Sequence, residues 1–271
     1  ASLAGSAGEA GSEAELLGPR LLFPIVSLSV AVILFEGGLT LRIHELQNAG
    51  RVVLRLVTVG ALVSWALTGF AAYWIFGLSL GTSALLGAVL VVTGPTVVAP
   101  LLRHIRPTRR IGSVVKWEGI VIDPIGAVLA VLVFEEVFSG HGSEEHMVVI
   151  VLRTAIVGGL LGWLSALVIV QLFKRFWVPD FLHGVFVLAV AIGVFALSNH
   201  FSEESGLVTV TVLGIALANQ KSISIRHIVE FKEHLGVMLI SCLFIVLGSR
   251  INPQSILDLH WRGPVFLAVM I

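Results

Sequence analysis

Charged side chains are scarce in this sequence: Asp, Glu, Lys and Arg make up 13% of it, where a soluble domain carries about 25%. Hydrophobic residues make up 56%, and the mean hydropathy is +1.00. These values exclude an ordinary soluble domain. They also exclude a disordered chain, which needs low hydrophobicity and high net charge. The composition is typical of a protein that crosses a membrane several times.

Other absences exclude further classes. The 17 basic residues are balanced by 17 acidic ones, so no global charge favours nucleic acid as a partner. The single cysteine, Cys242, excludes an intramolecular disulfide, and its apolar neighbours predict that it packs in the core. The sequence has no complete zinc-binding helix motif and no pair of intramembrane aspartates. We therefore expect a transporter rather than an enzyme, with no cofactor.

Long apolar runs predict an all-α polytopic membrane protein. Residues 56–102 contain no charged side chain, which is enough for two crossings of about 20 residues each. Backbone groups in hydrocarbon must be hydrogen-bonded within their own segment, so the spans are expected to be helices. The predicted spans are 21–41, 52–76, 81–102, 112–138, 147–173, 181–200, 205–219 and 231–250, with a truncated ninth after 262.

The two ends of the sequence suggest how it is organised. Residues 1–19 are rich in Ala, Gly, Ser and Glu and are expected to form a polar extracytoplasmic loop. Residues 20–271 are expected to form one transmembrane domain of eight full spans and part of a ninth. Because the sequence starts at Ala1 and the ninth apolar run is short, we expect it to be an internal segment of a longer chain.

The basic residues predict the orientation in the membrane. Lys and Arg accumulate in cytoplasmic loops, and 13 of the 17 basic residues fall in alternate loops, whereas acidic residues dominate the others. We therefore expect a protein of the plasma membrane whose cytoplasmic loops are 42–55, 103–116, 174–180 and 221–233. Four tryptophans near span ends are expected at the membrane interfaces: Trp74, Trp117, Trp177 and Trp261.

Three acids, Glu36, Glu118 and Asp123, lie inside predicted spans. A carboxylate at the bilayer centre costs at least about 2.5 kcal/mol, so each is a candidate functional residue. Asp123 is roughly 16 Å deep at 1.5 Å per residue, close to the midplane. The alternative for each acid is a structural role as a protonated or hydrogen-bonded group.

The backbone near these acids carries helix-breaking residues. The Thr93-Gly94-Pro95 run falls within one span, and Asp123-Pro124 falls within the next. Proline removes a helical hydrogen bond, and glycine weakens the helix. Oxygens freed by such a break, with the Thr93 hydroxyl among them, suit a hard cation. A simple kink that aids packing is the alternative, but a broken span beside a midplane carboxylate is typical of ion-coupled transporters.

Three runs then resemble a known family. Leu34-Phe35-Glu36-Gly37-Gly38-Leu39, the stretch from Thr93-Gly94-Pro95 to Leu102, and Glu118-Gly119-Ile120-Val121-Ile122-Asp123 resemble the monovalent cation:proton antiporters of the NhaP and NHE kind. The resemblance implies an inverted-repeat bundle of about thirteen helices with two crossed, partly unwound helices. This segment would hold the third to tenth helices and lack the second crossed one. A homodimer in the lipid bilayer is also implied.

By the same resemblance, Asp123 is the carboxylate shared by the monovalent cation and the proton, and Thr93 is a second ligand of that cation. Glu36 lines the site, and Glu118 pairs with an arginine beyond this C-terminus. The helix break lies at Gly94 and Pro95.

Three positions depart from the family pattern: Gly94, Gly119 and Ile122 stand where many members have Asp, a small hydroxyl residue and Asn. They leave fewer oxygens near the ion, which bears on sodium selectivity. The expected function is exchange of Na⁺ or K⁺ for H⁺ by alternating access, without net charge movement. A cation channel or an organic-anion secondary transporter is the alternative, and a conductance measurement separates a channel from an electroneutral exchanger.

Overall fold

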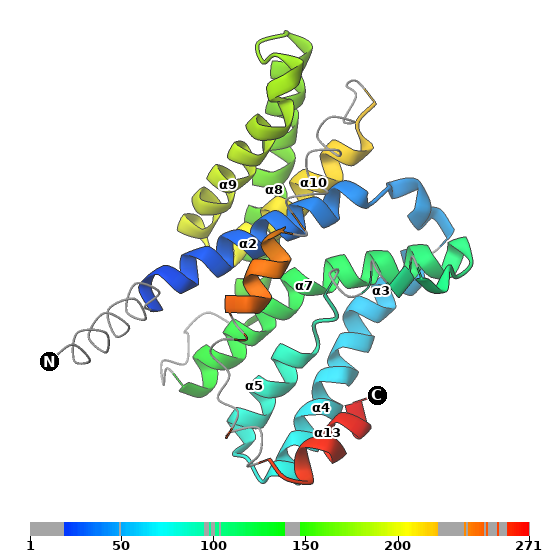
Figure 1. Cartoon of the computed structure of the whole chain (residues 1–271), viewed down its shortest axis with the longest axis vertical. Coiled ribbons are helices and arrows are strands. Elements are labelled where there is room, and N and C mark those ends of the chain that lie inside the picture. Colours follow the sequence, from blue (N-terminus) through cyan, green and yellow to red (C-terminus); the bar gives the residue numbers. More distant parts are fainter. Residues whose placement is uncertain are drawn as a thin grey trace, which may run out of the picture.

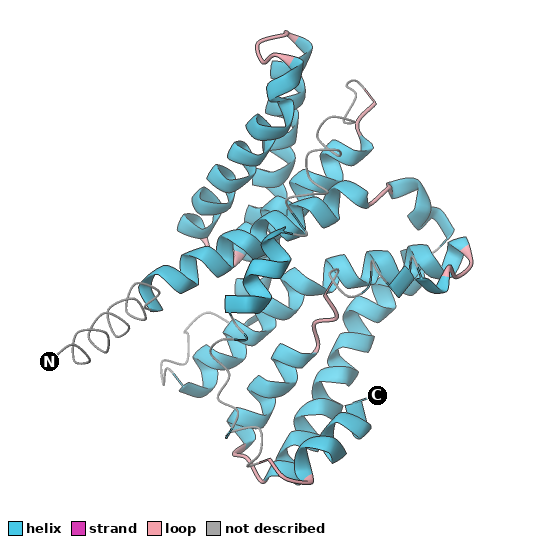
Figure 2. Ribbon diagram, viewed as in Figure 1, coloured by secondary structure: helices cyan, strands magenta, loops and turns pink. Residues whose placement is uncertain are grey.

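The structure, a computed structural model, confirms the all-α prediction in the part of the chain that it describes. There, helices are joined by short loops and turns, without strands (Figure 2). The predicted loop 1–19 lies almost entirely outside this part, and so do nine of the 20 residues of the predicted span 231–250. The structure describes residues 19–48, 50–94, 98, 101–102, 104–138, 147–221, 236, 238–246, 248, 254 and 259–270.

Most predicted spans correspond to one observed helix each. Among the described residues, three helical segments are long and apolar enough to cross a membrane: Gly50–Phe76, Val149–Lys174 and Asp180–Phe201. The main helices are α2 (Pro19–Thr40), α3 (Gly50–Arg55), α4 (Ala61–Phe76), α5 (Leu80–Leu90), α7 (Arg109–Phe138), α8 (Met147–Lys174), α9 (His183–Phe201), α10 (Ser205–Asn219) and α13 (Arg262–Met270). Short helical turns η1 (Ile43–Asn48), η2 (Leu56–Gly60) and η3 (Asp180–Leu182) connect them, η2 being a wider π-helical turn that joins α3 to α4.

The helices form two bundles that flank α7. In the first bundle, α2, α8, α9 and α10 share one apolar core, which includes Leu34, Ile169 and Leu213. In the second bundle, α4 packs against α5 and α13. The α7 helix runs between the bundles (Figure 1). Its buried face joins Leu41, Val53 and other residues in a separate apolar cluster.

Glycines let the helices of the first bundle approach closely. A Cβ atom on Gly214 of α10 would lie 2.5 Å from the backbone oxygen of Phe35 on α2. A Cβ atom on Gly38 of α2 would in turn lie 2.6 Å from the backbone oxygen of Thr211. In lipid, where burial from water does not drive helix association, such close backbone packing is a main source of stability.

A buried hydroxyl cluster joins the ends of α9 and α10. Ser198 Oγ lies 2.7 Å from Ser205 Oγ, and Thr209 Oγ1 lies 2.7 Å from Ser198 Oγ. The backbone N–H of Gly206 donates to Asn199 Oδ1 at 2.7 Å. The three hydroxyl side chains are fully buried, so these bonds avoid the cost of leaving them unpaired.

The turn between α9 and α10 holds Glu204, whose φ is +59°. Burial, with the nearby Glu203 charge adding to it, raises the pKa of the Glu204 carboxyl. The folded state therefore holds this proton more tightly than the unfolded state. The stability of the folded protein therefore falls as the pH rises from the ordinary pKa of a glutamate to the raised pKa of Glu204.

We expect Glu204→Gln to raise the melting temperature at about pH 8 and to leave it unchanged at about pH 4, where the carboxyl is protonated in both states. Melting curves of the full chain at the two pH values test this. Glu203→Gln, at the exposed neighbouring position, should give a smaller gain. An equal gain at both pH values would contradict the assignment.

Two expectations for single side chains prove wrong. Trp117 is 5% exposed and packs inside the α7 cluster instead of at an interface, whereas Trp74, Trp177 and Trp261 are exposed as expected. Cys242 is exposed rather than packed in the core. Position in the sequence did not distinguish the two environments, because a residue near a helix end or within an apolar run can face either the protein core or the surroundings of the helix.

Candidate functional site

The helix predicted to be discontinuous ends in the middle of its span. α5 stops at Leu90, and Val91 to Gly94 form a turn followed by non-helical backbone. Gly94 has a φ of +54°, a conformation that favours glycine because it has no Cβ atom. The predicted span 81–102 is therefore broken at Thr93 and Gly94. Pro95 lies outside the described residues.

The facing helix, α7, carries Glu118 and Asp123. It runs unbroken through Pro124, which is buried. Because proline has no N–H, the backbone oxygen of Ile120 lacks its usual helical donor. A backbone acceptor is thus freed within one turn of the Asp123 carboxyl.

The non-helical stretch after α5 is hydrogen-bonded to Glu118 and Asp123 of α7. The Thr93 hydroxyl donates to Glu118 Oε1 at 3.1 Å. The backbone N–H of Gly94 donates to Asp123 Oδ1 at 3.2 Å. Four residues singled out in the sequence, Thr93, Gly94, Glu118 and Asp123, therefore come together at one junction.

Two glycines of α7 accept the side chains that flank this stretch. Val92 packs against Gly126, so closely that a Cβ atom there would overlap it. A Cβ atom on Gly119 would lie 3.1 Å from Val98 Cγ2. Sequence analysis did not assign a role to Gly126, Val92 or Val98. The signal available was the spacing of the two glycines, two helical turns apart and on either side of Asp123.

Glu36 lies on the neighbouring helix α2. Its half-buried carboxylate faces Gly236, where any Cβ atom would collide with it. The next residue, Gly37, faces Ile120 of α7, whose Cγ1 would lie 3.4 Å from an added Cβ atom. Helix α2 therefore brings Glu36 close to α7, but the Glu36 carboxylate faces Gly236 and not the Thr93–Gly94 stretch.

The junction is an oxygen-rich site with acidic groups on one side. Within the described ranges, neither Glu118 nor Asp123 forms an ion pair with a basic side chain. The described residues also include no group of three His, Cys, Asp or Glu side chains that could hold a metal ion. Carboxylate, hydroxyl and backbone oxygens are ligands for hard cations. The same carboxyl groups can take up a proton instead.

Comparison with known proteins assigns this chain to a family. Residues 21–271 match the family described as "Sodium/hydrogen exchanger, transmembrane". The K(+)/H(+) antiporter NhaP of Alkalimonas amylolytica is 27% identical over 242 residues, which cover 89% of this chain and 42% of that protein. The K(+)/H(+) antiporter NhaP2 of Shewanella oneidensis is 25% identical over 242 residues, 88% of this chain and 42% of that protein. This chain therefore spans less than half the length of these two relatives.

A solved structure has the same fold. The sodium proton antiporter MjNhaP1 from Methanocaldococcus jannaschii at pH 8 superposes with a TM-score of 0.76 and 21% identity, covering 90% of this chain and 61% of that chain. At this identity the likeness concerns the fold alone. Together, the family match over nearly the whole sequence and the apolar helices show that this chain is a multi-pass membrane protein of the sodium/hydrogen exchanger family.

Proposed function

We propose that this protein exchanges a monovalent cation, Na⁺ or K⁺, for H⁺ by alternating access, with Asp123 as the shared binding group. The observation that supports this most directly is the bond from the Gly94 N–H to Asp123 Oδ1. It joins a carboxylate in the middle of a long helix to a broken backbone segment. The names of the two relatives, both K(+)/H(+) antiporters, and of the sodium proton antiporter with the same fold agree with this chemistry.

Charge explains why one carboxylate is enough for exchange. Asp123 with a bound proton, or with a bound monovalent cation, has no net charge. The empty carboxylate is negative, and a bare charge near the bilayer centre costs at least about 2.5 kcal/mol. The site therefore switches its access from one membrane face to the other far more readily when Asp123 holds a proton or a cation. The result is exchange of one proton for one cation, with no net charge moved.

The other site residues have distinct proposed roles. Thr93 supplies an oxygen to the cation, and Glu118 orients Thr93 through their hydrogen bond. Glu36 is an acid on the approach to the site. Gly94, Gly119 and Ile122 offer no side-chain oxygen, so we expect weak discrimination between Na⁺ and K⁺. Val98 leaves little room for a side chain at position 119.

The cellular setting follows from the same proposal. We place the protein in the plasma membrane, with loops 42–55, 103–116, 174–180 and 221–233 in the cytoplasm, and we expect a homodimer. The family supports a transporter rather than an enzyme.

A pH-gradient assay tests the proposed activity. Everted vesicles that contain the full-length protein are energised, and Na⁺, K⁺ or Li⁺ is added while a dye reports the proton gradient. Collapse of the gradient on addition of a cation, without electrical current, supports exchange and names the ion. A current carried by the cation would indicate a channel instead, and no response to any cation would contradict the proposal.

The role of Thr93 gives a separate prediction. We expect Thr93→Val to raise the cation concentration for half-maximal exchange about fivefold, because it removes one hydroxyl ligand worth about 1 kcal/mol. Thr93→Ser keeps the hydroxyl and should behave like the unaltered protein. Initial rates of dye recovery over a cation titration measure both variants. If Thr93→Ser were as impaired as Thr93→Val, the hydroxyl would not be the important group.

A further inference from the structure

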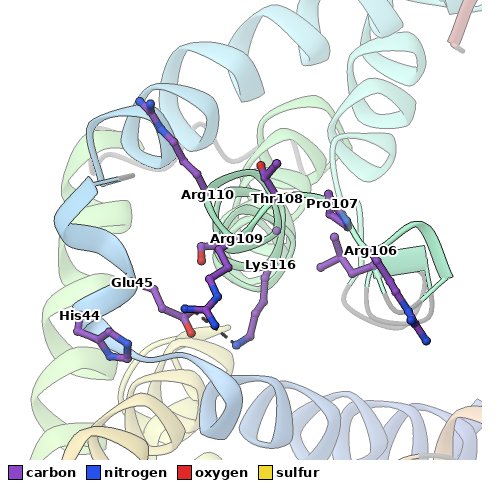
Figure 3. Close-up of a pocket in the computed structure, with 11 residues that line it drawn as sticks. His44, Glu45, Arg106, Pro107, Thr108, Arg109, Arg110 and Lys116 are labelled. Carbon is purple, nitrogen blue, oxygen red and sulfur yellow. Dashed lines mark ion pairs between the residues drawn. The ribbon is translucent and has the colours of Figure 1, made fainter.

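A large basic cavity lies outside the site described above. It has a volume of about 1010 Å³ and opens between η1 and the start of α7 (Figure 3). Its charged lining is mostly positive: Arg106, Arg109, Arg110 and Lys116, with Glu45 as the one acid among the lining residues. We call it the basic cavity.

One of these positive charges is already compensated. Lys116 Nζ lies 3.7 Å from Glu45 Oε2 and donates a hydrogen bond to the backbone oxygen of Thr40. This contact ties the start of α7 to η1 and to the end of α2. The three arginines are all exposed. Figure 3 shows Arg109 on the same side of α7 as Lys116, whereas Arg106 and Arg110 point away from Lys116 in opposite directions. Besides the Lys116–Glu45 pair, three arginines therefore line the cavity, and Arg109 is the one beside that pair.

Exposed apolar side chains are interspersed with the basic ones along the chain. Ile43, Ile105 and Ile111 are 52%, 63% and 55% exposed, and each is adjacent in sequence to a residue that lines the cavity. Leu101 is also exposed. Basic groups interleaved with exposed apolar ones at the end of a membrane helix suit a ligand with a charged head and hydrocarbon chains. A free inorganic anion would need only the charges.

We propose that the basic cavity binds the phosphate-bearing headgroup of an anionic phospholipid from the adjacent leaflet. Arginine matches phosphate because its planar guanidinium donates two parallel hydrogen bonds. The headgroup contacts the 106–110 segment and the start of α7, while its chains lie along the exposed isoleucines. Because α7 carries Asp123, a bound lipid contacts the helix that holds the proposed ion site.

Direct binding tests this inference without any transport measurement. The full chain in detergent is titrated with a short-chain phosphatidylglycerol, and in parallel with phosphatidylcholine of the same chain length and with inorganic phosphate. The variant is Arg106→Gln with Arg109→Gln. The matched control is Lys174→Gln with Arg175→Gln, which removes the same charge from exposed positions at the end of α8. Melting curves check that both variants fold.

We expect phosphatidylglycerol to bind the unaltered protein. We expect about 25-fold weaker binding to the Arg106 and Arg109 variant, at about fivefold for each arginine. The control should stay within about twofold. Equal binding of phosphatidylcholine, or an equal loss in the control, would overturn the proposal. Inorganic phosphate that binds as tightly as phosphatidylglycerol would also overturn it, by assigning the cavity to a free anion.

Discussion

Asp123→Asn is expected to abolish cation-dependent proton exchange while the protein still folds and inserts into the membrane. Asparagine has nearly the same shape as aspartate, and its side-chain oxygen can still accept the hydrogen bond from the Gly94 N–H. It can neither take up a proton nor carry a negative charge for a cation. The loss is therefore expected in the exchange rate rather than in protein yield.

The measurement is the pH-gradient assay on everted vesicles, with equal amounts of the altered and unaltered protein confirmed by immunoblot. Asp180→Asn is the matched control, because Asp180 is exposed in the turn before α9, where its carboxylate lies 3.6 Å from His183 Nε2. This control should retain full exchange. Exchange that persists in Asp123→Asn would rule out Asp123 as the shared site.

The second large effect is expected at the crossing of α2 and α10. In Gly214→Ala, the new Cβ atom would lie 2.5 Å from Phe35 O and 2.9 Å from Leu39 N. Both are backbone atoms of a packed helix, so relief requires the two helices to move apart. Overpacking of this kind costs about 3 kcal/mol. In a protein of this size, that corresponds to a melting temperature lower by about 5–10 °C.

Melting curves of the full chain in detergent measure this effect. Gly193→Ala on α9 is the control, because nothing lies within 4 Å of a Cβ atom added there. It makes the same chemical change in a neighbouring helix and should leave the melting temperature unchanged or slightly higher, since alanine is the better helix former. Similar melting temperatures for the two variants would show that the α2–α10 contact is looser than described.

Sequence alone determined the fold class and the approximate limits of most membrane helices. A span must satisfy its own backbone in hydrocarbon, so a long apolar run such as 147–173 leaves little choice but a helix, and α8 covers Met147–Lys174. The break near Thr93 was also readable, because glycine and proline act on the local backbone. The predicted span 81–102 is longer than α5, which ends at Leu90, because apolar residues continue past the end of that helix.

Only the tertiary structure decided which of these residues meet. The bonds from Thr93 to Glu118 and from Gly94 to Asp123 join two elements, and no local pattern specifies that pairing. Gly214 and Gly193 are the same residue type in similarly apolar helices, yet one touches a neighbouring backbone and the other faces open space. Local propensity and hydropathy act within one segment, whereas the site and the helix contacts arise from packing between segments.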